Sequence, residues 1–203
     1  MNSQARRIFY EGNTFNVLES VYEPAEDSFL LAESLVIKKS DLVLDVGTGC
    51  GLLAVLAAKV AKKVVATDVN SIAVRCALQN AVLNNVADKM DIRQGELFEP
   101  IKKDERFDII LFNAPYLPSE EWEEQELASQ AWAGGETGRE VIDRFIREAS
   151  AYLRENGRIL LVQSTLSDVE QSFQMFAELD LDAKVVSEKK VDFETIVVIE
   201  AIR

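Results

Sequence analysis

Two short stretches of this chain combine residue types that could hold a ligand and position a reacting group. The first covers residues 45–51, with the sequence DVGTGCG, and lies between an apolar run and an alanine-rich run. Glycines at such a strand-to-helix turn let a ligand approach the backbone, because no Cβ stands in the way. A tight turn that needs glycine only for packing is the alternative interpretation of this stretch.

The spacing of the glycines narrows the kind of ligand. A dinucleotide-binding fingerprint would require glycine at position 52, which is Leu52, and the third glycine is instead Gly51. The acid at the start of the motif, Asp45, would oppose a pyrophosphate and favour a cationic ligand. A second acid, Asp68, ends the next apolar run, where a carboxylate can accept hydrogen bonds from two ribose hydroxyls.

The second stretch covers residues 112–116, with the sequence FNAPY. The side-chain oxygen of Asn113 and the backbone carbonyl of Ala114 could accept both N–H groups of a flat nitrogen, and Tyr116 could stack on it. Pro115 keeps the preceding residue extended. Such a grip would orient a poor nucleophile and stabilise positive charge that develops on it. Asn before proline also begins ordinary turns, which is the alternative. The sequence has no histidine to act as a base, so we expect the proton to leave to water after transfer.

The elements around these motifs predict an α/β fold. Short apolar runs alternate with amphipathic or alanine-rich segments, which is typical of a parallel sheet covered by helices on both faces. The last two apolar runs are too close together for a helical crossover, so they predict an antiparallel hairpin. We expect strands at residues 42–46, 63–67, 90–94, 107–112, 158–162, 183–188 and 195–201, and helices at 52–60, 71–83, 138–153 and 164–179, with a further helix beginning near residue 22. Asn70 or Ser71 is the expected cap of the second of these helices.

Composition restricts the class of protein. The chain has 203 residues and a formal net charge of −13, which disfavours nucleic acid as a partner and favours either basic partners or simple solubility. Cys50 and Cys76 have no metal-ligand spacing, so no metal site is expected. No apolar run is long enough to span a membrane, and none follows Arg6 and Arg7 as in a secretory signal, so we expect a cytoplasmic protein.

With these residues in view, the chain resembles the class I S-adenosylmethionine-dependent methyltransferases. The resemblance implies a Rossmann-like fold with a mostly parallel seven-stranded sheet. It also implies S-adenosyl-L-methionine as the cofactor. The positions that would bind it are Asp45, Gly47, Gly49 and Gly51 for the methionine part, Asp68 and Val69 for the ribose, Glu96 and Leu97 on the adenine side, and Asn113. The family more often has Asp at position 96, and a plain surface turn is the alternative there.

The FNAPY stretch is similar to the Asn-Pro-Pro-Tyr motif of amino-group methyltransferases, which act on glutamine, adenine or guanine nitrogens. On this resemblance Asn113, Ala114, Pro115 and Tyr116 are the expected catalytic residues. The alanine replaces the first proline of the family motif; it retains the backbone carbonyl but loses rigidity.

Two further stretches resemble the HemK-related glutamine methyltransferases of the archaeal and eukaryotic branch. They are residues 21–31, VYEPAEDSFLL, and residues 131–145, AWAGGETGREVIDRF. In that family the region of Glu26 and Asp27 lies over the cofactor. The resemblance implies a single domain over residues 1–203, with residues 1–20 as a short extension. The implied substrate is a glutamine in the Gly-Gly-Gln loop of a class I translation termination factor. Some relatives pair, through the edge of the sheet, with a small zinc-binding activator.

Three alternatives remain open. A nucleic-acid methyltransferase would share the FNAPY motif, but the chain has no dense basic run. A protein lysine methyltransferase would need a deprotonated amine, to which this motif is less suited. A non-catalytic partner that binds cofactor only for its shape is the third. The long acidic connection at residues 118–135, with Trp122 and Trp132, could shape a substrate mouth or simply pack on the surface.

Overall fold

The computed structural model describes residues 6–116 and 137–203, and a seven-stranded sheet forms its centre. The strand order is β5-β4-β3-β6-β7-β9-β8, with β3 to β7 parallel and β9 antiparallel to both of its neighbours. The strands are β3 (Leu42–Val46), β4 (Lys63–Asp68), β5 (Met90–Gln94), β6 (Phe107–Asn113), β7 (Leu153–Ser164), β8 (Asp182–Lys190) and β9 (Thr195–Ile202). The mostly parallel sheet with an antiparallel C-terminal hairpin, expected from the sequence, is confirmed.

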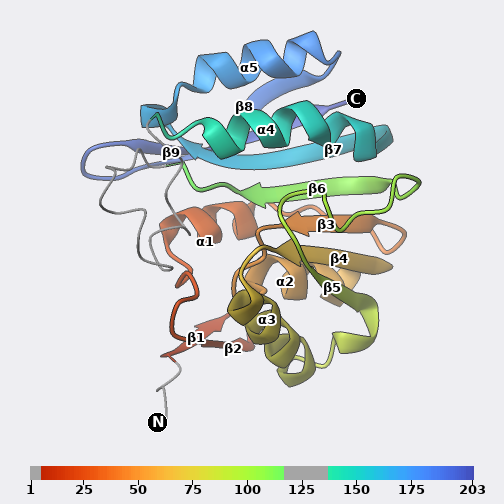
Figure 1. Cartoon of the computed structure of the whole chain (residues 1–203). Helices are drawn as coiled ribbons and strands as arrows, with labels where there is room; N and C mark the ends of the chain where they lie inside the picture. Colours follow the sequence, from red (N-terminus) through yellow and green to blue (C-terminus); the bar gives the residue numbers. More distant parts are fainter. Residues whose placement is uncertain (1–5, 117–136) are drawn as a thin grey trace.

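Helices cover both faces of the sheet, as expected (Figure 1). In the view of Figure 1, α4 lies in front of the sheet beside α5, and α2 lies behind it. The helices are α1 (Glu26–Glu33), α2 (Leu52–Val60), α3 (Ser71–Leu83), α4 (Glu140–Ala149) and α5 (Val169–Glu178). Between these layers the central strands β3 and β6 are almost fully buried, because a parallel strand covered on both faces has no solvated side.

The predicted and observed boundaries of helices and strands agree best where a local sequence signal sets them. Strands β3 and β5 and helix α2 have the expected bounds, and α3 is capped by the side chain of Asn70, which accepts a hydrogen bond from Ile72 N at 2.9 Å. Two expected helices are shorter than predicted. Helix α4 ends at Ala149, since the chain tightens into a 3-10 turn, η4 (Ser150–Tyr152), and enters β7.

The helix expected at 164–179 also starts late. A 3-10 turn, η5 (Thr165–Ser167), comes first, and Asp168 then adopts a left-handed conformation with φ 51°. The carboxylate of Asp168 accepts a hydrogen bond from Gln171 N at 3.1 Å and so caps α5. The apolar periodicity extends across both pieces, which is why it predicted one helix.

The N-terminal extension contains an element that was not predicted from the sequence. Strands β1 (Arg6–Tyr10) and β2 (Asn13–Val17) form a two-stranded hairpin that packs on α3. The amide side chains of Asn80 and Asn84, one helical turn apart, each donate to and accept from the backbone of one β2 residue, Asn16 and Thr14 respectively, at 2.8–3.1 Å. They stand in for a neighbouring strand, because they satisfy backbone groups that an isolated hairpin leaves open.

No helix within the described ranges has the length and apolar character that crossing a membrane requires.

Candidate active site

The glycine turn joins the end of β3 to the start of α2 and brings three left-handed residues together. Gly47, Gly49 and Gly51 have φ values of 64°, 56° and 84°. A Cβ on Gly49 would meet nothing within 4 Å, so packing does not require glycine there, whereas a Cβ on Gly51 would lie 3.0 Å from the Cβ of Ala77 on α3. Gly49 therefore leaves room for a ligand, and Gly51 allows α2 and α3 to approach closely.

Asp68 ends β4 beside this turn. Its carboxylate accepts hydrogen bonds from Gly49 N and from Asn70 N, each at 2.9 Å. Burial raises the pKa of this carboxyl, and the two N–H donors oppose that rise. The acid therefore ties the glycine turn to the adjacent strand end.

A cavity of about 510 Å³ opens along the carboxyl ends of β3, β4 and β6, the place where parallel sheets bind ligands. Its size is that of a typical small-molecule site. The residues expected at the site that line it are Asp27, Gly47, Gly49, Asp68, Val69, Glu96, Leu97, Asn113, Ala114, Pro115 and Tyr116.

Three residues that were predicted to bind the cofactor, Glu26, Asp45 and Gly51, do not line this cavity. Glu26 is exposed, and Gly51 packs against Ala77. Asp45 is buried behind the turn, where its Oδ2 accepts a hydrogen bond from Thr48 Oγ1 at 2.6 Å and its Oδ1 has no partner among residues 6–116 and 137–203. Burial raises the pKa of Asp45 to about 7, although the Thr48 hydroxyl opposes the rise. Asp45 and Gly51 shape the turn from behind, whereas Glu26 lies on the surface at the start of α1.

The expected adenine-side acid, Glu96, lies at the cavity wall but already has a partner. Its carboxylate forms an ion pair with Arg144 of α4 at 2.5 Å, and this hydrogen bond lowers the pKa of Glu96. Beside it, Leu97 is buried with φ 44°, and its carbonyl accepts a hydrogen bond from Thr67 Oγ1 at 3.2 Å. The ion pair leaves this acid less able to contact an adenine amino group than its position alone implied.

Asn113 is the last residue of β6, and only the nitrogen of its side-chain amide has hydrogen-bond partners in the described part of the chain. Its Nδ2 donates to Asp27 Oδ2 and to Ser28 Oγ, both at 3.1 Å. Its Oδ1 is buried and has no hydrogen-bond partner within the described part of the chain. We call this atom the open acceptor. A buried acceptor is almost always paired in a native protein, so an unpaired one on a residue that lines a ligand-sized cavity is a candidate contact for a ligand donor.

Two tyrosines surround the carboxylate of Asp27. Tyr22 Oη donates to both of its oxygens, at 2.8 and 2.9 Å, and Tyr116 Oη lies 3.5 Å from Oδ2. Burial raises the pKa of both phenols, and the nearby carboxylate raises it further, so both stay protonated as donors. Neither Tyr22 nor Ser28 was predicted at the site, although both lie in the stretch at residues 21–31.

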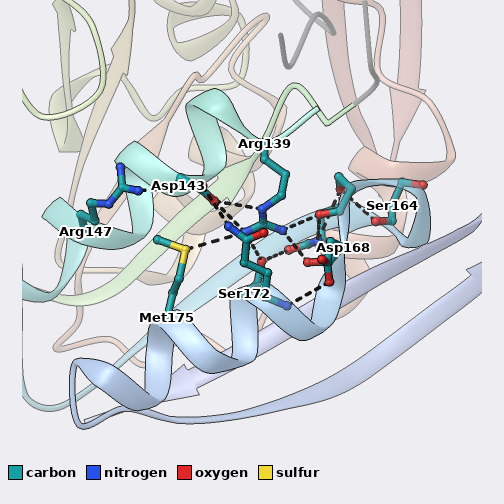
Figure 2. A network of polar contacts seen from close by, with 10 residues as sticks. Arg139, Asp143, Arg147, Ser164, Asp168, Ser172 and Met175 are labelled. Atoms are coloured by element: carbon teal, nitrogen blue, oxygen red, sulfur yellow. Dashed lines mark hydrogen bonds and ion pairs between the residues drawn. The ribbon is translucent and has the colours of Figure 1, made fainter. Parts of the chain in front are cut away.

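Of the second HemK-like stretch, residues 131–145, the structure describes positions 137–145. Arg139, at the start of α4, is 5% exposed and contacts η5 and α5 rather than the cavity (Figure 2). Its guanidinium donates to the carboxylate of Asp143 at 2.7 and 3.0 Å, to Ser172 Oγ at 3.1 Å, and to the carbonyls of Ser167 and Asp168. Arg139 is therefore structural, whereas Val141 of the same stretch lines the cavity. Trp122 and Trp132 lie outside the described residues.

In residues 6–116 and 137–203, no three histidine, cysteine or acidic side chains are grouped so that they could hold a metal ion.

Comparison with known proteins agrees with this geometry. The Methyltransferase small domain family matches residues 20–191. A protein of Methanocaldococcus jannaschii, provisionally named a protein N5-glutamine methyltransferase, is 40% identical over 97% of this chain and 98% of its own length. The human methyltransferase HEMK2 is 32% identical, covering 89% of this chain and 88% of its own.

Among solved structures, Mtq2 of E. cuniculi has a similar fold. It superposes with a TM-score of 0.70 and 24% identity, over 91% of this chain and 99% of its own. That protein was solved in an Mtq2–Trm112 complex, which is described as responsible for methylation of the translation termination factor eRF1. The coverage and identity of the sequence relatives, together with the fold and the cavity, show that the chain is a methyltransferase: it belongs to the methyltransferase small domain family and to its HemK-related branch.

Proposed function

We propose that this methyltransferase transfers the methyl group of S-adenosylmethionine to the side-chain amide nitrogen of a glutamine in the Gly-Gly-Gln loop of a class I translation termination factor. The observation that carries the proposal is the open acceptor, which belongs to a residue that lines the same cavity as the glycine turn. The names of the sequence relatives support the choice of glutamine, and the reported role of the Mtq2–Trm112 complex supports the choice of a termination factor.

The cavity suits the proposed donor. Gly47 and Gly49 would accommodate its methionine part, and Asp68 with Val69 would contact the ribose, since the Asp68 carboxylate lies at the cavity wall. Asp45, which is buried behind the turn, would act through its hydrogen bond with Thr48, a residue that lines the cavity, rather than by direct contact. When bound, the donor supplies an electrophilic methyl group on a sulfonium.

The chain's own residues would prepare the acceptor nitrogen. The open acceptor would take one N–H of the glutamine amide and the carbonyl of Ala114 the other, so that the nitrogen points at the methyl group. Both contacts strengthen as positive charge develops on nitrogen. Pro115 holds the backbone extended, and Tyr116 packs beside the flat group. The proton then leaves to water.

The test is incubation of the purified chain with labelled S-adenosylmethionine and an intact termination factor, followed by mapping of the label by mass spectrometry. We expect the label on the Gly-Gly-Gln glutamine, and none on a matched factor in which that glutamine is replaced by asparagine. Label on lysine instead would favour a protein lysine methyltransferase, and label on added RNA or DNA would favour a nucleic-acid methyltransferase. Either result would overturn the glutamine assignment.

We also propose that a small zinc-binding activator pairs with the edge of the sheet at β5. Support comes from the exposed apolar side chains beside that edge: Leu78 and Val82, one turn apart on α3, are 47% and 67% exposed. The Trm112 partner of Mtq2 is a precedent. Residues 1–203 would act as one methyltransferase domain in the cytoplasm, where termination factors act.

Co-expression with a candidate activator and size-exclusion chromatography test this second proposal. Val82→Asp should abolish co-elution, because it places a charge on the apolar surface. Val36→Asp, at a residue that is also highly exposed but lies between α1 and β3, should leave co-elution intact. Equal behaviour of the two variants would contradict the placement at β5.

A further inference from the structure

The hydrogen bonds of Asn113 account for every donor of its amide group. One N–H is directed to Asp27 Oδ2 and the other to Ser28 Oγ, which itself donates to Asp27 Oδ1 at 3.1 Å. An amide has two orientations of nearly equal shape, related by exchange of its nitrogen and oxygen. In the exchanged orientation the Asn113 oxygen would face a carboxylate oxygen, and two acceptors would oppose each other. The carboxylate therefore selects the orientation in which the nitrogen faces Asp27 and the oxygen is the open acceptor.

The carboxylate of Asp27 has no capacity left for a further ligand. Its two oxygens already accept from Tyr22 Oη, Ser28 N, Ser28 Oγ and Asn113 Nδ2, and Tyr116 Oη lies at the limit of hydrogen-bond distance. Two carboxylate oxygens offer about four lone-pair sites. The side chain is also 5% exposed. These contacts argue against the direct cofactor contact expected from the sequence.

We infer that Asp27 is a positioning residue for methyl transfer, which fixes and polarises the Asn113 amide so that its oxygen is presented to the acceptor nitrogen. The inference rests on the proposed function, since it assigns Asn113 to the acceptor. A negative charge hydrogen-bonded to the amide N–H also draws electron density onto the amide oxygen. The charge of Asp27 thus reaches the acceptor nitrogen through Asn113, where it stabilises the positive charge formed as the nitrogen–methyl bond forms and the sulfur–methyl bond breaks.

The first experiment measures Asp27→Asn in steady-state kinetics. We expect kcat to fall about 10- to 100-fold, as for a lost orienting contact, while the Kd for S-adenosylmethionine measured by calorimetry changes less than about twofold. Asp41→Asn is the matched control, because Asp41 is also buried and caps Lys38 N at 2.8 Å away from the cavity. It should keep kcat. A loss of donor affinity in Asp27→Asn with unchanged kcat would overturn the inference.

The second experiment exchanges the two residues. In Asn113→Asp alone, two carboxylates face each other and repel; adding Asp27→Asn restores an amide N–H opposite a carboxylate oxygen. We expect Asp27→Asn to lower kcat in the wild-type background and to raise it in the Asn113→Asp background. A merely structural role for Asp27 would give the same sign in both backgrounds, and that result would overturn the inference.

A third measurement needs no acceptor and so separates this inference from the proposed function. The side-chain amide resonances of Asn113, assigned by their absence in Asn113→Asp, should shift in Asp27→Asn and stay unchanged in Asp41→Asn. Unchanged resonances in Asp27→Asn would refute the positioning contact. If the wild-type chain labels no glutamine while these resonances respond, the proposed substrate fails, and the kinetic tests are repeated with whichever acceptor is labelled.

Discussion

Two buried polar networks lie near the carboxyl ends of neighbouring strands, one at the end of β6 and one just after β7. They differ in one respect. Around Arg139, all three guanidinium nitrogens donate hydrogen bonds, and α4, η5 and α5 are joined through them (Figure 2). Around Asn113, the amide nitrogen is fully used, but the amide oxygen has no partner in the described ranges. A saturated network stabilises a fold, whereas a network with one buried group left open is set up for a ligand.

Each network includes residues from a stretch that resembles HemK-related enzymes. Asp27 lies in residues 21–31 and Arg139 in residues 131–145, so sequence similarity alone does not tell which network is structural. The hydrogen-bond inventory does, because it shows which polar groups remain available. Disrupting the two networks should therefore have opposite consequences for stability and for catalysis.

The largest expected effect is on stability, from Arg139→Ala. Removing Arg139 takes the charged donor from Asp143 and from the carbonyls of Ser167 and Asp168. Since Gln171 still donates to Asp143 and Gln163 to Ser167, we expect the free energy of unfolding to fall by about 3 kcal/mol, the lower end for a broken buried pair. Urea unfolding measures this loss, and kcat per folded molecule should stay near the wild-type value. Arg139→Lys, which keeps the charge but not the planar fork, should lie between. A loss below about 1 kcal/mol would mean that the network is not structural.

Asn113→Ala should have the reverse effect. Removing the open acceptor should lower kcat by about 10²- to 10³-fold, as for other lost contacts to developing charge. We expect the Kd for S-adenosylmethionine to change little and the free energy of unfolding to fall by about 1–2 kcal/mol, because the substitution also removes the donor to Asp27 and Ser28. Single-turnover kinetics and calorimetry measure these quantities. Retained single-turnover activity would refute the role of this residue.

Gly49 and Gly51 of the glycine turn give a second contrast between packing and ligand binding, with smaller expected effects. Gly51→Ala combines a left-handed backbone with a clash on Ala77 and should destabilise the fold by about 2–3 kcal/mol. Gly49→Ala has a similar backbone strain but open space, so it should cost about 1 kcal/mol of stability and mainly weaken donor binding. Thermal unfolding with and without S-adenosylmethionine tests the pair. The reverse order would contradict the assignment of one glycine to packing and the other to the ligand.

The last prediction concerns the pH dependence of the free energy of unfolding. The pKa of Asp45 rises from 3.8 to about 7 on folding, so between these values the native state holds a proton that the unfolded state has lost. The contribution of this group to stability is therefore present in full below about pH 4 and is lost as the pH rises toward 7. Asp45→Asn should show a smaller loss of stability between pH 5 and pH 8 than the wild-type chain in urea unfolding. Parallel profiles would show that Asp45 does not titrate in this range.

Local patterns in the sequence were enough to predict much of this molecule. Apolar runs and a side-chain cap set β3, β5, α2 and α3, because these signals act between residues a few positions apart. The strand-helix alternation then brought the glycine turn and the FNAPY motif to one edge of the sheet, since parallel strands all end on the same side.

The tertiary structure alone decided which polar groups find each other. Asn113 meets Asp27 across 86 positions of sequence, Glu96 meets Arg144 across 48, and Asn80 meets Asn16 across 64. Those contacts gave the Asp27 carboxylate donors from its own chain, paired Glu96 with an arginine, and docked a hairpin in a region predicted only as an extension. A hydrogen bond is made within about 3 Å, and local periodicity carries no information about distances between residues so far apart in the chain.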